Sequence, residues 1–457
     1  MRGTTRTWWI YALPVGILLA VTLPHLAQGD FRAETAHYGA IGHQSWQPLA
    51  PFWALYEYPS VPYFNKPPLV FWIHGGVLHL FGISLPAARL PSILAAAGCL
   101  LFTVGLARRE LGRATALATG VILALSYEYF RRTREISLDL WQLFFMMGAL
   151  RFWMAASSRR HGPVWLAGLF LGLALLCKPL TALMLPLILL FWTFLGVPRR
   201  TTRVRDFAIL LGMALLTCLP WHLAMTARFD GEFLTQYFGR EVADRMHGLR
   251  NREPVWYYAV EIGRTYWPWM LLFIAGIGCW ARRRVSSRHS RILGAALVWV
   301  VAWAVALSLF PDKRPRYALP LYPMMALIAG YGAALLPWKG LRQWYRRGLP
   351  VTAVLILAAG LAAALLPLRV QAPPDPCLAA LTDWARLQDP AQVYSAAMTS
   401  SDESMIYLKA GYWPIPLRLH PQPAPGSLLL CTEGITTGPL PAGLCIFHQG
   451  PYRVIKR

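Results

Sequence analysis

The stretch ILGAALVWVVAWAVALSL at 292–309, followed by PDKRPRY at 311–317, decides the fold class of this chain. The first part is an uncharged apolar run of the length that crosses a bilayer. The second part places three cations within four residues, directly before another apolar run. Charges at the end of a membrane helix are costly unless they are paired or bind something. The stretch therefore predicts a membrane span that leads into a functional segment.

The overall composition fits a membrane protein. Of 457 residues, 56% are hydrophobic and 14% are charged, and the mean hydropathy is +0.41. A soluble domain usually carries about 25% charged residues. The formal net charge is +23, but the basic residues form short clusters between apolar runs rather than one basic face. This pattern argues against nucleic acid as a partner.

The basic clusters predict the orientation of the chain. Cytoplasmic loops of membrane proteins are rich in Lys and Arg, so these clusters, and with them the N-terminus, are assigned to the cytoplasm. The clusters are Arg2/Arg6, Arg108/Arg109/Arg113, Arg159/Arg160, Arg199/Arg200/Arg203/Arg205, Arg282/Arg283/Arg284/Arg288 and Lys339/Arg342/Arg346/Arg347. Spans are expected at 8–28, 90–107, 114–127, 138–155, 163–177, 180–197, 207–226, 264–281, 292–309, 317–336 and 349–368. We predict an all-α polytopic protein of the bacterial inner membrane with about 11 to 13 transmembrane helices.

The transmembrane domain is expected to cover residues 1–369, with two long periplasmic loops at 29–68 and 227–263. The apolar run 69–84 breaks the alternation of spans between the two faces. Two alternatives remain for it: a re-entrant or interfacial helix, or a failure of the charge rule at one loop.

Residues 370–457 have no long apolar run and are rich in Pro and Gly, so we predict a small α+β domain in the periplasm. Short strand-like runs are expected at 391–394, 405–408, 427–431 and 452–455. The domain contains Cys377, Cys431 and Cys445. In an oxidising compartment one disulfide is expected, with Cys431–Cys445 as the first choice and one thiol left over.

Charged residues collect at the ends of spans on the predicted periplasmic side. They are the carboxylates Asp30, Glu34 and Asp139 and the cations Lys66, Lys178, Arg245, Lys313, Arg314 and Arg316. Structural roles are open to all of them, because carboxylates can face a helix dipole and long cations can extend to the interface. A carboxylate can also act as general base on an acceptor hydroxyl, and cations can neutralise a phosphate leaving group. Together the residues suit glycosyl transfer from a phosphate-linked lipid donor.

Seven short motifs, taken in their order along the chain, resemble the bacterial membrane glycosyltransferases of the C superfamily. They are DFRAETAHY at 30–38, YFNKPP at 63–68, AARLPS at 87–92, SLD at 137–139, CKP at 177–179, LPW at 219–221 and KRPRYALP at 313–320. The chain is most similar to the lipid A aminoarabinose transferases and their protein O-mannosyltransferase relatives. The resemblance covers roughly residues 8–340, and the Lys-Pro-Pro and Lys-x-Pro-x-Tyr elements are its most specific parts.

The resemblance implies a polyprenyl-phosphate sugar donor, a lipid or glycan acceptor of the cell envelope, and an active site at the periplasmic membrane surface. It places the catalytic acid of the first loop on Asp30 or Glu34, with Asp30 ahead because the family's acid directly follows the first helix. A second acidic position falls on Asp139. Contacts to the donor phosphate fall on Lys66, Lys178, Arg245, Lys313, Arg314, Arg316 and Tyr317.

Two departures from the family pattern matter. Relatives usually carry adjacent Asp and Glu in the first loop, whereas three residues separate Asp30 from Glu34, so the base stays open between them. Relatives also carry Glu where Asn65 stands. Because that Glu contributes to a metal site in some members, the resemblance leaves a divalent cation in doubt and its ligands unknown.

The leading hypothesis is an inverting transferase that uses a lipid-linked sugar. The alternative from another class is a lipid or polysaccharide transporter or flippase, which would need a polar site near the membrane midplane. The charges here lie at helix ends instead. Within the enzyme class, a protein O-glycosyltransferase is the alternative. A non-catalytic relative is a third possibility, against which the retention of Asp30, Glu34, Lys66 and Lys178 speaks.

Overall fold

The computed structural model describes residues 8–335 and 376–456, apart from residues 32, 49–52, 59–60, 157–161, 198–203, 240–251, 268, 283–285, 399, 411–413, 417–426, 433–443 and 450–451. The chain forms two compact units. The first comprises Met1–Leu26, Phe64–Val70 and Ser92–Leu368, and the second Ala27–Tyr63, Phe71–Pro91 and Arg369–Arg457. The division at residue 369 stays a prediction, since the second unit also includes two N-terminal segments.

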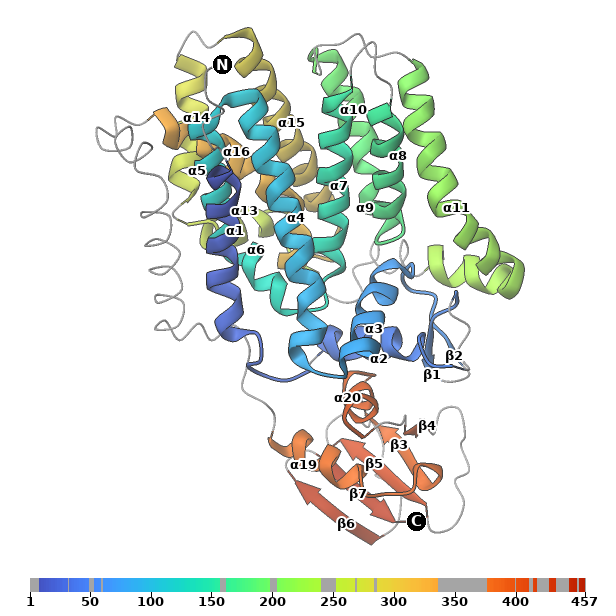
Figure 1. Ribbon diagram of the computed structural model, residues 1–457. Coiled ribbons are helices and arrows are strands. Elements are labelled where there is room, and N and C mark those ends of the chain that lie inside the picture. The colour runs from blue at the N-terminus through green and yellow to red at the C-terminus, as the bar shows by residue number, and fades with distance from the viewer. Residues whose placement is uncertain are drawn as a thin grey trace. The chain divides into compact units, whose positions relative to one another are not determined.

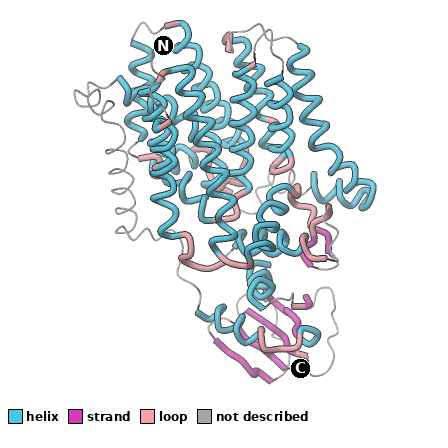
Figure 2. Tube along the Cα trace, in the orientation of Figure 1, coloured by secondary structure: helices cyan, strands magenta, loops and turns pink. Residues whose placement is uncertain are grey.

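The first unit is a bundle of helices (Figure 1 and Figure 2). Its elements are α1 (Trp9–Thr22), η1 (Leu23–His25), α4 (Leu85–Leu111, which begins in the second unit), α5 (Arg113–Ala124), α6 (Tyr127–Arg131), η2 (Arg132–Arg134), α7 (Leu138–Ala155), α8 (Gly162–Leu175), α9 (Pro179–Ala182), α10 (Met184–Phe194), α11 (Val204–Leu234), η3 (Thr235–Gly239), α13 (Tyr257–Thr265), α14 (Trp269–Arg282), α15 (Ser287–Leu309), η4 (Pro315–Leu321) and α16 (Tyr322–Leu335).

The predicted fold class, a helical membrane protein with a small C-terminal sheet domain, is confirmed. Four described helices are long and apolar enough to cross a membrane: Leu85–Leu111, Val204–Gly239, Arg288–Leu309 and Pro315–Leu335. Shorter apolar helices occupy most of the other expected spans. The expected span at 349–368 lies outside the described residues.

Two of the expected spans differ from the helices that form. The run 180–197 is divided between α9 and α10, because Pro186 in the first turns of α10 has no amide hydrogen to bond to the preceding turn. The run 207–226 lies inside α11, which continues to Leu234 and changes direction at Asp230, where φ is +46°. Apolar periodicity alone does not show either feature.

The helices pack in two connected groups. α8 packs against both α7 and α11, whereas α16 contacts α5, α14 and α15. The contact of α14 with α16 depends on glycine. A Cβ atom added to Gly276 would lie 2.3 Å from the carbonyl oxygen of Ile328, and one added to Gly332 would lie 2.5 Å from that of Leu272. The two backbones therefore approach closely at these positions.

The second unit contains two parts of the chain that are distant in sequence. The N-terminal part has α2 (Ala33–Gln44), the hairpin β1 (Tyr56–Tyr58) and β2 (Val61–Pro62), and most of α3 (Leu69–Phe81). The C-terminal part has α19 (Pro376–Ala385), η5 (Pro390–Gln392), β3 (Val393–Ala397), α20 (Ser400–Ala410), β4 (Ile415–Pro416), β5 (Leu428–Thr432), β6 (Leu444–Gln449) and β7 (Tyr452–Lys456). α2 packs against α20, which links the two parts. α3 has 13 residues, about 20 Å at 1.5 Å per residue, and its membrane topology stays a prediction.

The five-stranded sheet has the order β4-β3-β5-β7-β6, with β3 parallel to β4 and β5, and the remaining pairs antiparallel. The strands expected at 427–431 and 452–455 correspond to β5 and β7, and the run at 391–394 overlaps the start of β3. The strand expected at 405–408 is wrong, because this segment is part of α20. Its sequence begins with two serines and carries Asp402 and Glu403 in the first turn, which favours a helix start.

The disulfide expected between Cys431 and Cys445 is also wrong. All the cysteines are thiols in the structure. Cys431 lies on β5 opposite Arg453, and Cys445 lies on β6 opposite Ile455, so β7 separates the two cysteines. Two strand spacings amount to about 9.5 Å, whereas a disulfide needs Cα atoms within about 7 Å.

We predict that Gly276→Ala destabilises the bundle by about 1–3 kcal/mol, because the new methyl group meets backbone that cannot move away cheaply. Gly278→Ala on the same helix is the matched control, since nothing lies within 4 Å of its Cβ position. Thermal unfolding in detergent measures both variants. Equal unfolding temperatures would contradict the close α14–α16 contact.

Candidate active site

Local hydrogen bonds fix the start of α7, which carries Asp139 in its first turn. The Ser137 hydroxyl accepts a hydrogen bond from the backbone N–H of Leu140 at 3.2 Å, a typical N-cap. Ser92 on α4 accepts from the Ser137 N–H at 3.1 Å and donates to the carbonyl of Glu135 at 2.7 Å. These bonds hold Asp139 at a defined position.

Asp139 lies between two cations. The Lys178 ammonium is 2.5 Å from one carboxylate oxygen, and the Arg316 guanidinium is 3.8 Å from the other. All three side chains are largely buried, at 9% exposed for Lys178, 12% for Asp139 and 16% for Arg316. The ring of Tyr317 completes the group, since Lys178 lies 5.0 Å and Arg316 5.5 Å from its centroid. The structure thus brings together four residues that the sequence placed in three separate motifs.

The backbone at Lys178 is held as firmly as its side chain. The residue is extended, as expected directly before Pro179. Its carbonyl accepts a hydrogen bond from the side-chain amide of Gln142 at 2.8 Å, and the same amide donates to the Thr181 hydroxyl at 2.6 Å. Gln142 follows Asp139 by one turn on α7, so one helix positions both ends of Lys178. Sequence reasoning did not single out Gln142.

Lys66 and Lys178 line one pocket of about 70 Å³. The rest of its wall consists of Asn65, Pro67, Pro179, Leu180, Thr181, Leu183, Tyr237 and Phe238. Several of these apolar side chains are exposed, with Leu183 at 49% and Phe238 at 51%. The pocket therefore combines two cations with an apolar wall that reaches the surface of the unit.

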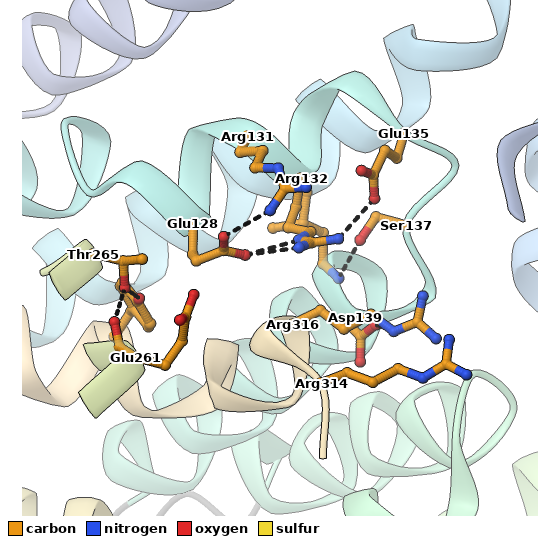
Figure 3. Close-up of polar contacts among 12 residues, drawn as sticks. Glu128, Arg131, Arg132, Glu135, Ser137, Asp139, Glu261, Thr265, Arg314 and Arg316 are labelled. Atoms are coloured by element: carbon orange, nitrogen blue, oxygen red, sulfur yellow. Dashed lines mark hydrogen bonds and ion pairs between the residues drawn. The ribbon is translucent and has the colours of Figure 1, made fainter. Parts of the chain in front are cut away.

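A second ionic group lies close to Asp139, and sequence analysis missed its central member. Figure 3 shows Glu128 of α6 accepting from Arg131 at 3.0 Å and from Arg132 at 2.8 Å, while Arg132 also donates to Glu135 at 2.9 Å. Glu128 is 1% exposed. The spacings of three and four residues on a helix were the available signal. The charge of Arg132 also acts on Asp139 and on Arg316.

The remaining cations of 311–317 are held by backbone contacts. Lys313 is 3% exposed, and its ammonium donates to the carbonyls of Phe310 at 2.6 Å and Glu253 at 3.1 Å. These contacts indicate a role in holding the segment together. The Tyr258 hydroxyl contacts the backbone N–H and carbonyl of Arg314, each at 3.3 Å. Arg245 lies outside the described residues.

The two first-loop carboxylates belong to the second unit. Asp30 accepts a hydrogen bond from the Phe31 N–H at 2.8 Å, and its other oxygen lies 2.7 Å from the Lys409 ammonium of α20. Glu34 lies in the first turn of α2, one turn before His37, whose charge it influences. Asp30 is thus ion-paired to Lys409, and Glu34 acts electrostatically on His37.

Further contacts join α20 to the N-terminal part of this unit. Glu403, which is 2% exposed, accepts hydrogen bonds from the hydroxyls of Tyr58 and Ser395. The ring of His43 on α2 lies 3.1 Å from the Tyr407 hydroxyl. Both contacts come from α20, the helix that contains the segment 405–408 for which a strand was expected.

The donor atoms present do not fit a divalent cation at the pocket. Among the described residues, no three His, Cys, Asp or Glu side chains gather as metal ligands. The described wall of the pocket carries two lysines and the amide of Asn65 but no carboxylate, whereas Mg²⁺ is usually bound by proteins through one or two carboxylates.

The chain is similar to several known proteins. A model of the dolichyl-phosphate-mannose-protein mannosyltransferase family matches residues 65–223. An undecaprenyl phosphate-alpha-4-amino-4-deoxy-L-arabinose arabinosyl transferase of Pseudomonas fluorescens is 26% identical over 341 residues, which is 71% of this chain and 60% of the relative. A protein of Aquifex aeolicus is 30% identical over 267 residues, which is 58% of this chain and 52% of the relative. The chain spans between 52% and 60% of the length of these two relatives.

Two solved structures share the fold. ArnT from Cupriavidus metallidurans, bound to undecaprenyl phosphate, matches with a TM-score of 0.77 at 18% identity, covering 99% of this chain and 98% of that chain. The oligosaccharyltransferase AglB from Archaeoglobus fulgidus, in complex with an inhibitory peptide and a dolichol-phosphate, matches with a TM-score of 0.59 at 14% identity, covering 91% and 65%.

The fold is therefore shared with ArnT and AglB. The particular proteins that the chain resembles are the aminoarabinose transferases, which agree with it in sequence and in fold. The predicted resemblance is confirmed.

The histidines of α2 make the second unit sensitive to acid. Burial lowers the pKa of His37, against the opposing effects of Glu57 and Glu34, and burial also lowers the pKa of His43. The unfolded state then binds more protons than the folded state below about pH 6.5, so stability is full above that pH and decreases as the pH falls. We predict smaller hydrogen-exchange protection factors in α2 at pH 5 than at pH 8, each taken relative to the intrinsic exchange rate at the same pH. A double variant, His37→Gln with His43→Gln, should lose most of this difference, and an unchanged pH profile would contradict the assignment.

Proposed function

We propose that the protein is a glycosyltransferase of the inner membrane that transfers a sugar from a polyprenyl-phosphate donor to a lipid A-like lipid or another envelope acceptor, with inversion. The pocket lined by Lys66 and Lys178 carries this proposal, because it joins two cations to an apolar wall. A phosphorylated isoprenoid has the matching chemistry, an anionic head on an apolar chain. The names of the relatives support the same class of donor.

In the proposed reaction, the acceptor oxygen forms a bond to the anomeric carbon while the bond from that carbon to the phosphate oxygen breaks. The phosphate keeps the electron pair, and the acceptor proton passes to a carboxylate of the first loop. Lys66 and Lys178 stabilise the charge that grows on the phosphate. The electrostatic stabilisation by Lys178 is large because this side chain is already desolvated.

Asp139 is suited to hold Lys178 in place rather than to accept a proton. Both of its oxygens face cations, and a carboxylate between cations has little affinity for a proton. The Tyr317 ring packs against the same ammonium group, and Arg316 packs against that ring, so both add to this positioning. Arg314 and Arg245 remain proposed phosphate contacts by resemblance alone.

The first-loop carboxylates divide between two proposed roles. The ion pair with Lys409 occupies one carboxylate oxygen of Asp30, which favours an orienting role for Asp30. Glu34, one turn before the partly buried His37, is the better candidate for the base. The sequence had favoured Asp30 over Glu34 as the catalytic carboxylate, and this proposal reverses that preference.

A protein acceptor is the second candidate. The matching family model is named for a protein mannosyltransferase, and it covers the segment with Lys66, Asp139 and Lys178. Mass spectrometry of envelope lipids and of periplasmic proteins, from cells with and without the gene, distinguishes the two acceptor classes. A transporter would leave both unmodified, and the purified protein would form no glycosylated product in detergent.

We further propose a multi-pass arrangement with the N-terminus in the cytoplasm and the C-terminal domain in the periplasm. The basic clusters support this orientation.

We predict that Lys66→Met and Lys178→Met each weaken binding of a polyprenyl-phosphate analogue by about tenfold to a hundredfold, the usual effect of losing a hydrogen bond to a charged group. Arg264→Gln is the control, because this side chain is 76% exposed and pairs with Glu261 on the surface. Isothermal titration in detergent measures the affinities. Wild-type affinity in both lysine variants, with normal thermal stability, would remove the pocket from the donor site.

We predict that Glu34→Gln lowers transfer by about 10²–10⁴, as expected for loss of a general base. Asp30→Asn and Lys409→Met should lower the transfer rate by similar and smaller factors, because each breaks the same ion pair. Single-turnover rates with saturating donor measure the chemical step. If Asp30→Asn is the most damaging of the three and Lys409→Met is silent, Asp30 is the base and our assignment is wrong.

A further inference from the structure

We propose that the end of the bundle opposite to Asp139 holds a second anion site, which binds a phosphate group at the membrane surface. The site is a pocket of about 150 Å³ among α4, α7, α10 and α15. It is lined by Arg109, Glu110, Met154, Gly196, Val197, Arg288, Arg291 and Ile292. Met154 lies at the last turns of α7, an 18-residue helix, so the pocket is about 25 Å from the residues described above.

The charges of the pocket are strongly unbalanced. Among the described residues, three arginines and one glutamate line it. A fourth arginine, Arg151, packs beside Gly105 and acts electrostatically on Arg109. Arginine presents paired donors that match the oxygens of phosphate. The pocket therefore favours an anion of this type over a cation or a neutral ligand.

Glu110 arranges the arginines rather than cancelling them. One of its oxygens is 3.0 Å from Arg288 and the other is 3.3 Å from Arg109. Arg288 also donates to the backbone carbonyl of Arg109 at 2.6 Å. One carboxylate thus holds two guanidinium groups at one place, and both remain about two-fifths exposed, at 41% for Arg109 and 38% for Arg288.

The backbone also leaves room at this place. Gly196 has φ of +65°, and a Cβ atom added to it would lie 3.3 Å from the guanidinium of Arg291. A larger residue would therefore be strained and would crowd Arg291. The N-terminal end of α15, which carries Arg288 and Arg291, adds the positive end of a helix dipole.

The apolar part of the wall identifies the favoured source of the phosphate. Met154, Val197 and Ile292 lie beside the arginines, so the pocket is apolar on one side and cationic on the other. Basic pockets between membrane helices bind the head groups of anionic lipids. Free phosphate shares the ligand chemistry but gains nothing from the apolar side.

The test uses the full-length protein in nanodiscs of phosphatidylcholine with or without phosphatidylglycerol. Arg291→Gln and Arg109→Gln are the test variants, and two are used because either change could disturb folding. Arg205→Gln is the matched control, because Arg205 is an exposed cation near the start of α11 and does not line the pocket. Native mass spectrometry counts the lipids that each variant retains, and melting temperatures report stabilisation.

We expect selective retention of phosphatidylglycerol by the wild type and by Arg205→Gln. Each pocket variant should bind it about fivefold more weakly, which corresponds to about 1 kcal/mol per cation. Stabilisation by inorganic phosphate in pure phosphatidylcholine, equal to that by phosphatidylglycerol, would support the anion site and assign it to free phosphate. The proposal would be overturned if all three variants lost phosphatidylglycerol binding equally. It would also be overturned if the wild type showed no preference for phosphatidylglycerol over phosphatidylcholine and no stabilisation by inorganic phosphate. Donor binding and transfer are measured separately, so these outcomes do not depend on the proposed reaction.

Discussion

The ion pair between Asp139 and Lys178 is the contact on which the geometry of the candidate site depends. A buried ammonium without a partner is costly, and Asp139 removes most of that cost at 2.5 Å. The carboxylate has to stand at a helix start, where the Ser137 cap fixes it. The extended backbone before Pro179 then brings the lysine to it. Two short motifs that lie 39 residues apart thereby act as one unit.

Much of this arrangement could be predicted from the sequence, because helix length, apolar composition and capping are local properties. The fold class and most of the helices of the bundle follow from them. So does Asp139 at the start of a helix, since Ser137 precedes it. The break between α9 and α10 was also readable, as Pro186 interrupts the run, although a hydropathy window averages over it.

The parts that could not be predicted depend on contacts between distant segments. Met405-Ile-Tyr-Leu408 has the composition of a strand, but it belongs to a helix that starts at Ser400 and packs against α2 and α19. The predicted disulfide was wrong for a similar reason, because sequence does not show that β7 lies between Cys431 and Cys445. Phosphate binding by Lys313 stays a prediction, and sequence did not show that its ammonium donates to the backbone carbonyls of Phe310 and Glu253. A cation beside an apolar run has several possible partners, and sequence does not select among them.

The helix α20 has a consequence for how this protein can be recombined with its relatives. Through Lys409, Glu403 and Tyr407 it contacts three separate points of the N-terminal part of its unit: Asp30, Tyr58 and His43. Exchanging the C-terminal domain alone would remove all three partners at once and leave Asp30, Tyr58 and His43 without them. A chimera that retains its activity would need to exchange α20 and residues 27–63 together. The two segments therefore have to be exchanged as one unit, although they lie at opposite ends of the chain.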